Sequence, residues 1–323
     1  MMKRRAFFKQ TIQAGVLVSL PLSLSAFELT QTQKLKIGIV ADVHQDVIHD
    51  GMARLRSFMD DMNKRRPDFI LQMGDFALPH SYNQPFLDIW NEFEGPKYHI
   101  LGNHDMDHGY SKEQTMAWWR MSKRYYSFDQ GGFHFIVLDG NEENPKPWSG
   151  YNRYIGKEQK EWLRTDLGKT TKPTIVLLHQ SIEAPEGGVA NQEEIRNILE
   201  DATISKNQSK VIACLSGHHH DDYMKEINGI PYIQINSMSY KWVGGEYAQK
   251  RFPEHIENAY PYLKMTCLYR DPLYTVLTLD KKEGSLHIEG RKTQFVPPEP
   301  KEIGIPYADE MLPTITERNI EFS

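Results

Sequence analysis

The chain has 323 residues, of which 39% are hydrophobic and 25% are charged. This is the composition of a folded globular protein, and it excludes a disordered chain, a collagen and a coiled coil. Two cysteines, Cys214 and Cys267, are too few for a disulfide-rich scaffold or a cysteine-based zinc cluster. The net charge of −5 gives the chain no general attraction to nucleic acid polymers or anionic membranes.

The first 26 residues have the pattern of an export signal. They contain four basic residues and no acidic one, and residues 10–27 carry no charge. The apolar stretch at about residues 12–24 is short for a transmembrane helix, which needs roughly 20 apolar residues. Small residues follow at Ser23, Ser25 and Ala26, where a signal peptidase could cut. We therefore expect residues 1–26 to be a signal peptide, the mature protein to be periplasmic or secreted, and no stable membrane span.

Two export routes are open for this signal. The segment from Lys3 to Lys9 resembles a twin-arginine export signal, with Arg4 and Arg5 as its arginine pair. The alternative is a general secretory signal that happens to contain two arginines. The twin-arginine route carries folded proteins, which suits an enzyme that binds metal before export. Removal of the segment makes the net charge four units more negative.

After residue 34 the chain alternates short apolar runs with amphipathic segments, a pattern typical of α/β proteins. The apolar runs predict strands at residues 35–41, 69–73, 97–101, 133–139, 174–178, 211–215, 230–236, 273–279 and 285–289. The amphipathic segments predict helices at residues 52–64, 84–93, 113–122, 157–167 and 192–201. We expect one domain over residues 34–297, followed by a polar C-terminal tail, residues 298–323, without a clear partner.

Five short polar motifs directly follow predicted strands. They are Asp42-Val43-His44, Gly74-Asp75, Gly102-Asn103-His104-Asp105, His179 and Gly217-His218-His219-His220. The carboxyl ends of strands in an open α/β sheet face a common crevice where ligands bind. We therefore expect these five loops to bring their side chains together.

The side chains in these motifs have the chemistry of metal ligands. Carboxylate, imidazole and amide groups without a thiolate suit zinc, manganese or iron rather than a soft metal. In an extended segment residues i and i+2 point the same way, so Asp42 and His44 could share one ion, as could His218 and His220. Each motif alone also fits an ordinary turn or a solvated loop. Five motifs in this order, each at a strand end, together predict a metal site.

The ordered set of motifs resembles the calcineurin-like metallophosphoesterase family. The motifs span residues 42–220, and the resemblance in strand order covers about residues 35–292. It implies a four-layer αββα sandwich, in which two mixed β-sheets pack face to face and are flanked by helices. It also implies a dinuclear centre of Mn, Fe or Zn ions, divalent or of mixed valence, and hydrolysis of phosphoesters by a metal-bound hydroxide.

The resemblance also implies a role for most of the motif residues. The first metal would be held by Asp42, His44 and His220, and the second by Asn103, His179 and His218. Asp75 would bridge the two ions. His104 would face the substrate phosphate and the leaving oxygen as a general acid or hydrogen-bond donor, oriented by Asp105. His219 occupies a variable position and has no assigned role.

At two positions this chain differs from the motifs of particular subfamilies, which argues against its belonging to them. Purple acid phosphatases use a tyrosine ligand where this chain has Leu78, so we expect no iron–tyrosinate centre. Manganese-dependent ADP-ribose and CDP-alcohol diphosphatases look similar in layout but typically carry Gln at the position of His44, which argues against that activity.

We expect a hydrolase of small phosphoesters, in which a phosphodiesterase is favoured and a nucleotide is one candidate substrate. A phosphomonoesterase of the same fold and a non-catalytic phosphoesterase-like scaffold are the alternatives. The complete ligand set and His104 argue against the scaffold. A nuclease is disfavoured, and no nucleic acid polymer is expected as a partner, because the sequence contains no basic stripe to neutralise phosphates.

Three loops could shape the pocket, at residues 78–84, 107–110 and 141–154. The third contains Trp148, Tyr151 and Arg153. An aromatic ring beside an arginine could stack a base and pair with a phosphate. The same composition also fits a surface Ω-loop that is packed by its own aromatic side chains.

Overall fold

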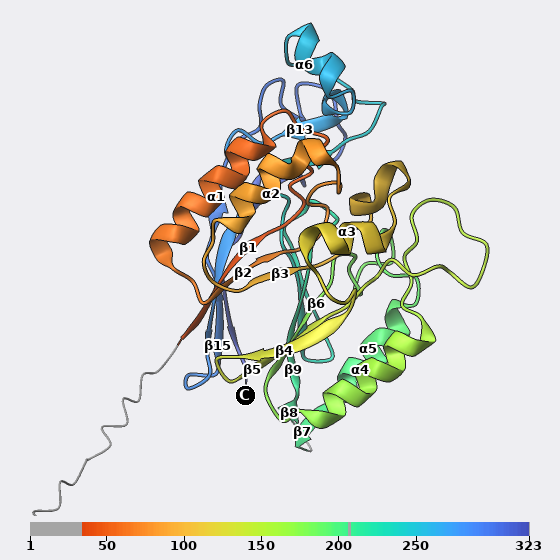
Figure 1. The fold of residues 1–323 in the computed structure, drawn as a ribbon, viewed down its shortest axis with the longest axis vertical. Helices are drawn as coiled ribbons and strands as arrows, with labels where there is room; N and C mark the ends of the chain where they lie inside the picture. The colour runs from red at the N-terminus through yellow and green to blue at the C-terminus, as the bar shows by residue number, and fades with distance from the viewer. Residues whose placement is uncertain (1–33, 206–207, 323) are drawn as a thin grey trace, which may run out of the picture. The chain divides into compact units, whose positions relative to one another are not determined.

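The computed structural model describes residues 34–205 and 208–322. The predicted signal peptide, with Arg4 and Arg5, lies outside these residues. Within them, two six-stranded sheets pack face to face, and helices cover their outer faces (Figure 1). The predicted four-layer sandwich of two mixed sheets is therefore confirmed.

The first sheet consists of β1 (Leu35–Val40), β2 (Phe69–Gln72), β3 (Lys97–His99), β14 (Thr275–Asp280), β15 (Ser285–Ile288) and β18 (Arg318–Glu321). Its strand order is β18-β15-β14-β1-β2-β3. β1, β2 and β3 are parallel, whereas β14, β15 and β18 pair antiparallel in succession from β1. The loops after β1, β2 and β3 therefore leave the sheet at one edge.

The second sheet consists of β4 (Tyr126–Gln130), β5 (Phe133–Val137), β6 (Thr174–Leu177), β9 (Val211–Ser216), β10 (Met224–Ile227) and β11 (Ile230–Gln234). Its strand order is β10-β11-β9-β6-β5-β4. The four central strands are parallel, and β4 and β10 are antiparallel edges. The loops after β6 and β9 thus also leave their sheet at a common edge.

Alternate residues of the strands fill the space between the sheets. Ile37 and Ile39 of β1 pack there with Phe135 and Val137 of β5, whereas Ile136 packs on the opposite face of its sheet. Both faces of the central strands are buried, so their sequences are continuous apolar runs rather than alternating ones. This explains why the apolar runs predicted these strands well.

Five helices cover the outer faces of the sheets (Figure 1). Apolar side chains of the first three pack on the first sheet, and those of the last two pack on the second. The first three are α1 (Gly51–Arg65), α2 (Gln84–Asn91) and α3 (Lys112–Trp119), and the last two are α4 (Lys157–Lys169) and α5 (Gln192–Glu200). Because both outer faces are occupied, the sheet edge that carries the loops is where a ligand can approach.

Shorter elements complete the described part of the chain. β12 (Tyr240–Trp242) pairs antiparallel with β13 (Thr266–Leu268), and α6 (Glu254–Ala259) lies between them in sequence. The other small sheets pair β7 (Thr203–Ser205) with β8 (Gln208–Ser209) and β16 (Arg291–Lys292) with β17 (Thr314–Ile315). Three 3₁₀ helices are η1 (Ser81–Asn83), η2 (His104–Gly109) and η3 (Leu263–Met265). No helix in the described ranges is both long and apolar enough to cross a membrane.

The prediction that residues 298–323 form a polar tail without a clear partner is wrong, because this segment packs on the domain. β18 forms the edge of the first sheet, where Leu286 of β15 pairs with Ile320. Ile305, Met311 and Ile315 are buried in the core between the sheets. These apolar residues are separated by several polar ones and follow no helical or strand period, so the sequence pattern does not reveal them. The folded domain therefore extends well beyond residue 297.

Candidate metal centre

The loops that follow five strands bring six of the seven predicted metal ligands into two groups, and place the seventh, Asn103, on the loop that is hydrogen-bonded to Asp75. Asp42 and His44 follow β1, Asp75 follows β2 and Asn103 follows β3; His179 follows β6, and His218 and His220 follow β9. All are buried except His218, which is half-buried. The ligands thus come from the carboxyl ends of parallel strands in both sheets.

Backbone hydrogen bonds hold these loops against one another. The N–H of Asp42 donates to Gly74 O at 3.1 Å, and the N–H of His44 donates to Asp75 O at 2.9 Å. In the second sheet, the N–H of Gly217 donates to His179 O at 3.1 Å. The backbone of His218 donates to both carboxylate oxygens of Asp42, which joins the two sheets at the site.

The backbone at the site is not extended. The expectation that Asp42 and His44, and His218 and His220, point the same way along an extended segment is therefore wrong. Asp42, His44, Asp75, His218 and His220 all have φ between 50° and 77°, in the left-handed region. This region is uncommon for residues other than glycine, although Asp and His are enriched there. Each such residue costs about 1–3 kcal/mol, and such strain gathers at functional sites. Tight turns, rather than alternation along a strand, aim these side chains inward.

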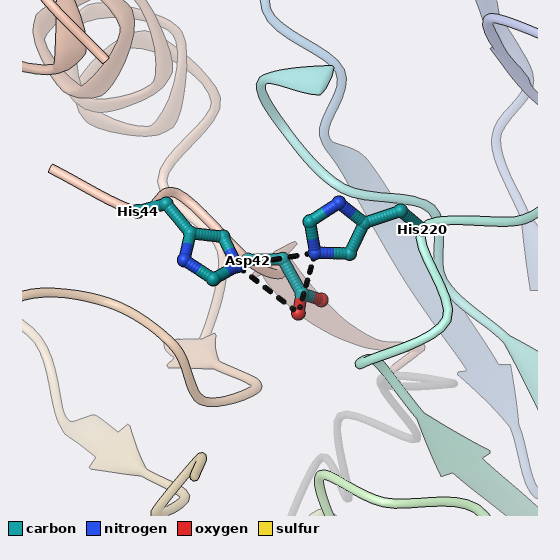
Figure 2. A group of neighbouring side chains, drawn as sticks. All are labelled: Asp42, His44 and His220. Carbon is teal, nitrogen blue, oxygen red and sulfur yellow. Dashed lines mark hydrogen bonds and ion pairs between the residues drawn. The ribbon is translucent and has the colours of Figure 1, made fainter. Parts of the chain in front are cut away.

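The first group of ligands consists of Asp42, His44 and His220, whose side chains converge in Figure 2. Asp42 Oδ1 lies 3.3 Å from His220 Nε2 and 3.9 Å from His44 Nε2. The two imidazole Nε2 atoms are 3.1 Å apart. One carboxylate oxygen and two imidazole nitrogens therefore surround one small volume, as an N/O metal site requires.

The second group consists of Asp75, His179 and His218, and Asp75 also contacts the first group. Asp75 Oδ2 lies 3.1 Å from His179 Nε2 and 3.5 Å from His44 Nε2. Its other oxygen, Oδ1, accepts the backbone N–H of His104 at 2.8 Å. A single carboxylate oxygen thus faces histidines of both groups, which is the position of a bridging ligand.

The donor atoms fit metal ions, because two histidine rings are oriented by hydrogen bonds, and His179 Nε2 and Asn103 Oδ1 have no hydrogen-bond partner among the described residues. His179 Nδ1 donates to Met73 O at 2.9 Å, and His220 Nδ1 donates to Tyr240 O at 2.8 Å. In its neutral form each ring then keeps a lone pair on Nε2, and metal-binding histidines usually have such a partner on the other nitrogen. The buried Asn103 amide has no hydrogen-bond partner among the described residues. Its oxygen is free to bind a cation.

Gly102 is required by close packing beside the bridging carboxylate. A Cβ at this position would lie 2.2 Å from both the backbone nitrogen and Oδ1 of Asp75. No side chain can be accommodated there without displacing Asp75. The glycine therefore sets the distance between the loops after β2 and β3.

The protonation of the site shows how strongly its groups interact. Burial opposes the charge of Asp75, but His179 and His104 hold its pKa well below its usual range. Burial also opposes the cation of His179, whereas Asp75 and Asp42 raise the pKa of His179 to about 9. Burial lowers the pKa of His44 and of His218 well below their usual range. Metal ions would compete with protons for these nitrogens.

His104 lies beside the metal ligands but is held by a residue other than the one predicted. Its Nδ1 donates to Asp107 Oδ2 at 2.7 Å, and its ring centroid is 5.1 Å from that of His44. Tyr151 donates from its hydroxyl to Asp107 Oδ1 at 2.8 Å, and this hydroxyl lies 3.1 Å from His104 Nδ1. Asp107 therefore orients His104, and Nε2 is left available to a substrate.

The predicted role of Asp105 as the partner of His104 is wrong. Asp105 is buried, and its carboxylate accepts the backbone N–H groups of Asp75, Phe76 and Gly102 at 2.7–2.9 Å. The chain enters the 3₁₀ helix η2 at His104, so adjacent side chains diverge and the residue three positions later returns to the same side. Asp105 therefore fixes the loop that carries Asp75, and Asp107 lies beside His104.

The ligands open into a cleft of about 600 Å³. His44, Asp75, His218 and His220 line it together with His104, Asp107 and several aromatic side chains. Of the three loops predicted to shape the pocket, 107–110 contributes Asp107 and His108, and 141–154 contributes Tyr151. No residue of 78–84 is among the lining residues of the cleft in the described part of the chain.

The loop at 141–154 is packed by its own side chains. Asn141 and Tyr154 form a β-bridge that closes its ends. Arg153 lies over the Trp148 ring, 5.0 Å from its centroid, and Trp148 Nε1 donates to Tyr151 O at 2.9 Å. Only Tyr151 of this trio lines the cleft. The Ω-loop interpretation thus describes Trp148 and Arg153 better than a stacking site for a base.

Comparisons with known proteins agree with this site. Residues 35–222 match the calcineurin-like phosphoesterase family. A probable cyclic nucleotide phosphodiesterase of Synechococcus is 28% identical over 206 residues, which is 59% of this chain and 75% of that protein. A manganese-dependent ADP-ribose/CDP-alcohol diphosphatase of Arabidopsis thaliana is 22% identical over 267 residues, which is 62% of this chain and 85% of that protein. A solved dimetal phosphatase from Danio rerio shares the fold, with a TM-score of 0.58 and 14% identity over 82% of this chain and 99% of that chain.

Proposed function

The chain belongs to the calcineurin-like phosphoesterase family and is a metal-dependent phosphoester hydrolase, and we propose that its preferred substrates are small phosphodiesters. The observation that carries this proposal is the charge of the cleft. None of the described residues that line it is Lys or Arg, whereas Asp75 and Asp107 are both present. A diester phosphate carries one negative charge and a terminal monoester carries about two near neutral pH. Beyond the bound ions and His104, the described lining offers no cation to the second negative charge of a monoester, so the cleft suits the diester.

We propose that the two bound ions are Mn, Zn or Fe, since the donor atoms are nitrogen and oxygen only. One relative is named for manganese, which makes Mn²⁺ the first ion to test. Bound ions supply Lewis acidity toward the phosphoryl group and hydroxide at neutral pH. The chain itself adds His104, whose Nε2 can donate a proton or hydrogen bond to the leaving oxygen while Asp107 holds its Nδ1.

The test compares two substrates that release the same leaving group. Purified protein is stripped with a chelator, reloaded with Mn²⁺, and assayed on bis-p-nitrophenyl phosphate and on p-nitrophenyl phosphate. The proposal expects a higher kcat/KM for the diester, and no hydrolysis by the stripped protein. Faster hydrolysis of the monoester would favour a phosphomonoesterase instead. No hydrolysis of either ester by protein that holds two ions would favour the non-catalytic scaffold.

We also propose that the protein is exported, periplasmic or secreted, by the twin-arginine route. The support is the sequence pattern of residues 1–26, with Arg4 and Arg5 ahead of a short apolar stretch. Replacement of both arginines by lysine keeps the positive charge and should abolish export through this route. Unchanged export of the double variant would indicate the general secretory route.

A further inference from the structure

We propose that Trp242 and Tyr262 form a stacking subsite at the mouth of the cleft for a nucleobase that is joined to the phosphodiester through a sugar. This inference rests on the proposed diester activity and names the substituent that the diester carries. The two rings line the cleft that contains the metal ligands. They remain largely exposed, at 45% for Trp242 and 50% for Tyr262.

Exposed aromatic side chains are concentrated at this cleft. Among the described residues, three of the nine large apolar side chains with high exposure line it, namely Tyr151, Trp242 and Tyr262. Tyr151 is hydrogen-bonded to Asp107, so its hydroxyl already has a structural role. In the described part of the chain, no hydrogen bond holds the Trp242 or Tyr262 side chain. Aromatic faces that are left open beside a binding site can stack a base for about 1–3 kcal/mol each.

Backbone pairing holds these two aromatic residues close together. Trp242 is in β12 and pairs with Thr266 of β13. Tyr262 immediately precedes η3, whose Met265 N–H donates to Tyr262 O at 2.9 Å. The Val243 N–H donates to Met265 O at 2.9 Å, which ties the end of β12 to the same turn. The rings are therefore presented on an ordered backbone, and binding would spend little free energy on ordering it.

The distance from the metal centre to the rings selects the kind of substituent. The Tyr240 ring centroid lies 4.8 Å from that of the ligand His220, and 6.5 Å from that of Trp242. No ring contact joins Trp242 to a candidate ligand histidine among the described residues, so a group on the phosphate must reach beyond Tyr240 to meet Trp242. A base on a sugar reaches further from the phosphate than a ring bonded through one oxygen. Its planar face carries no charge, which matches a described lining without Lys or Arg.

Three diesters with the same p-nitrophenolate leaving group test the subsite. They are thymidine 5′-p-nitrophenyl phosphate, bis-p-nitrophenyl phosphate and methyl p-nitrophenyl phosphate. Trp242→Ala and Tyr262→Ala should each raise KM for the thymidine ester about five- to 150-fold. Neither variant should change kcat or KM for the methyl ester or the bis-aryl ester more than twofold. Tyr262→Phe keeps the ring and should behave like the wild type.

The matched control is Tyr307→Ala, which removes an aromatic side chain of similar exposure, 40%, that does not line the cleft. It should leave the KM of all three esters unchanged. Equal loss on all three esters for Trp242→Ala would show general damage and overturn the subsite, as would no change on the thymidine ester. Equal kcat/KM of the wild type for the thymidine and methyl esters would also overturn it, while the diester activity would stand.

Calorimetry of thymidine 5′-monophosphate binding to the Mn²⁺-loaded protein gives a readout that does not depend on hydrolysis. The Kd should rise at least fivefold in Trp242→Ala and in Tyr262→Ala, and should not change in Tyr307→Ala. If no diester is hydrolysed, the proposed activity fails and this comparison alone decides the subsite. Equal Kd values in the wild type and both variants would then overturn it.

Discussion

His104 has its Nδ1 committed to Asp107 and its ring beside the metal ligand His44. Burial lowers its pKa, but Asp75 and then Asp107 outweigh this and raise the pKa of His104 to about 9. Bound cations would neutralise the charge of Asp75 and so reduce its effect on the pKa of His104. The effect of Asp107 on this pKa would remain. The hydrogen bond to Asp107 is therefore the interaction that holds this ring for catalysis.

Removal of the His104 side chain should separate its role from metal binding. His104→Ala should keep the wild-type metal content, because His104 is in neither of the two candidate ligand groups found among the described residues. General acid help is typically worth 10²–10⁴-fold, so kcat should fall by about that factor for an alkyl diester, which has a poor leaving group. A p-nitrophenyl ester should lose less. Loss of metal would make His104 a ligand, and equal losses on both esters would make it a phosphate-binding group.

Asp107 can be tested in the same way as a positioning residue. Asp107→Asn keeps the shape but removes the charge opposite His104 Nδ1, and should lower kcat about 10- to 100-fold with little change in KM or metal content. Tyr151→Phe keeps the bond between Asp107 and His104 and should cost less. Tyr82→Phe is the matched control, since it removes a 2.7 Å hydrogen bond from a tyrosine to Asp46 away from His104. Losses in the control equal to those of Asp107→Asn would contradict the assignment.

At the residue scale the sequence predicted which candidate ligands would come together but misassigned the partner of His104. Their convergence was predictable because each follows an apolar strand, and the strand order determines where the loops go. Asp105 was chosen because it is adjacent in sequence, whereas the turn after Asn103 brings Asp107 back beside His104. The three-residue spacing between His104 and Asp107 was the signal in the sequence that could have indicated this pair. Tyr151 gave no such signal, because its contact with Asp107 joins residues 44 positions apart.

The C-terminal segment is the element whose contribution was least visible in the sequence. Met311 is 4% exposed and Leu312 is 50% exposed, although the two are adjacent. Met311→Ala should lower the free energy of unfolding by about 2–5 kcal/mol, because it leaves a cavity in the core between the sheets. Leu312→Ala should change it by less than about 0.5 kcal/mol. Urea denaturation at equal metal occupancy measures both, and equal small effects would mean that the segment does not pack on the domain.

His134 joins three elements and makes their contact depend on pH. Its Nδ1 faces Asp129 of β4 at 2.7 Å, and its Nε2 faces Asp166 of α4 at 2.8 Å. Burial opposes its charge, but the hydrogen bonds to Asp166 and Asp129 raise the pKa of His134 above its ordinary value. Lys172 pairs with Asp129, and Ser127 donates to Asp166, so both carboxylates are already partly satisfied. Two acceptors around one imidazole require both nitrogens to carry protons.

The stability that His134 provides should therefore fall as the pH rises. Because the pKa of His134 is higher in the folded state than in the unfolded state, its stabilisation of the fold is complete at pH values below the unfolded pKa of about 6.5. This stabilisation is lost as the pH rises through the folded-state pKa. The difference in unfolding free energy between the wild type and His134→Gln should be larger at pH 6 than at pH 9. A difference that is constant or grows with pH would contradict a charged His134. Chemical denaturation at both pH values measures it.

The central strands, the edge strand β3 and the helices were predictable from sequence, whereas the edge strands β4, β10 and β18 were not. Buried parallel strands are continuous apolar runs, as in β6 and β9, and the pattern is unambiguous. β10 and β18 are edges that alternate or mix exposed polar residues, so no apolar run marks them. Their places depend on pairing with partners already in the sheet, which is a tertiary effect.

For the whole molecule, the site depends on both sheets, since β1–β3 supply Asp42, His44, Asp75 and Asn103, and β6 and β9 supply the other histidines. Neither sheet alone carries a complete set of ligands for two ions. The strand order and the motif order together made this assembly predictable. The strained turns that orient these side chains were not predictable, because left-handed Asp and His conformations have no signature in the sequence.

The most direct test of the two-ion centre is the metal content of the wild type and of Asp75→Asn after reconstitution with Mn²⁺, measured beside diester hydrolysis. The wild type should hold two equivalents per chain, and activity should rise as the second is bound. In Asp75→Asn, one neutral amide replaces the oxygen that faces both groups of histidines, so metal content and activity should fall together. Two equivalents retained with near-native turnover in Asp75→Asn, or full activity of the metal-free wild type, would contradict the bridged two-metal centre.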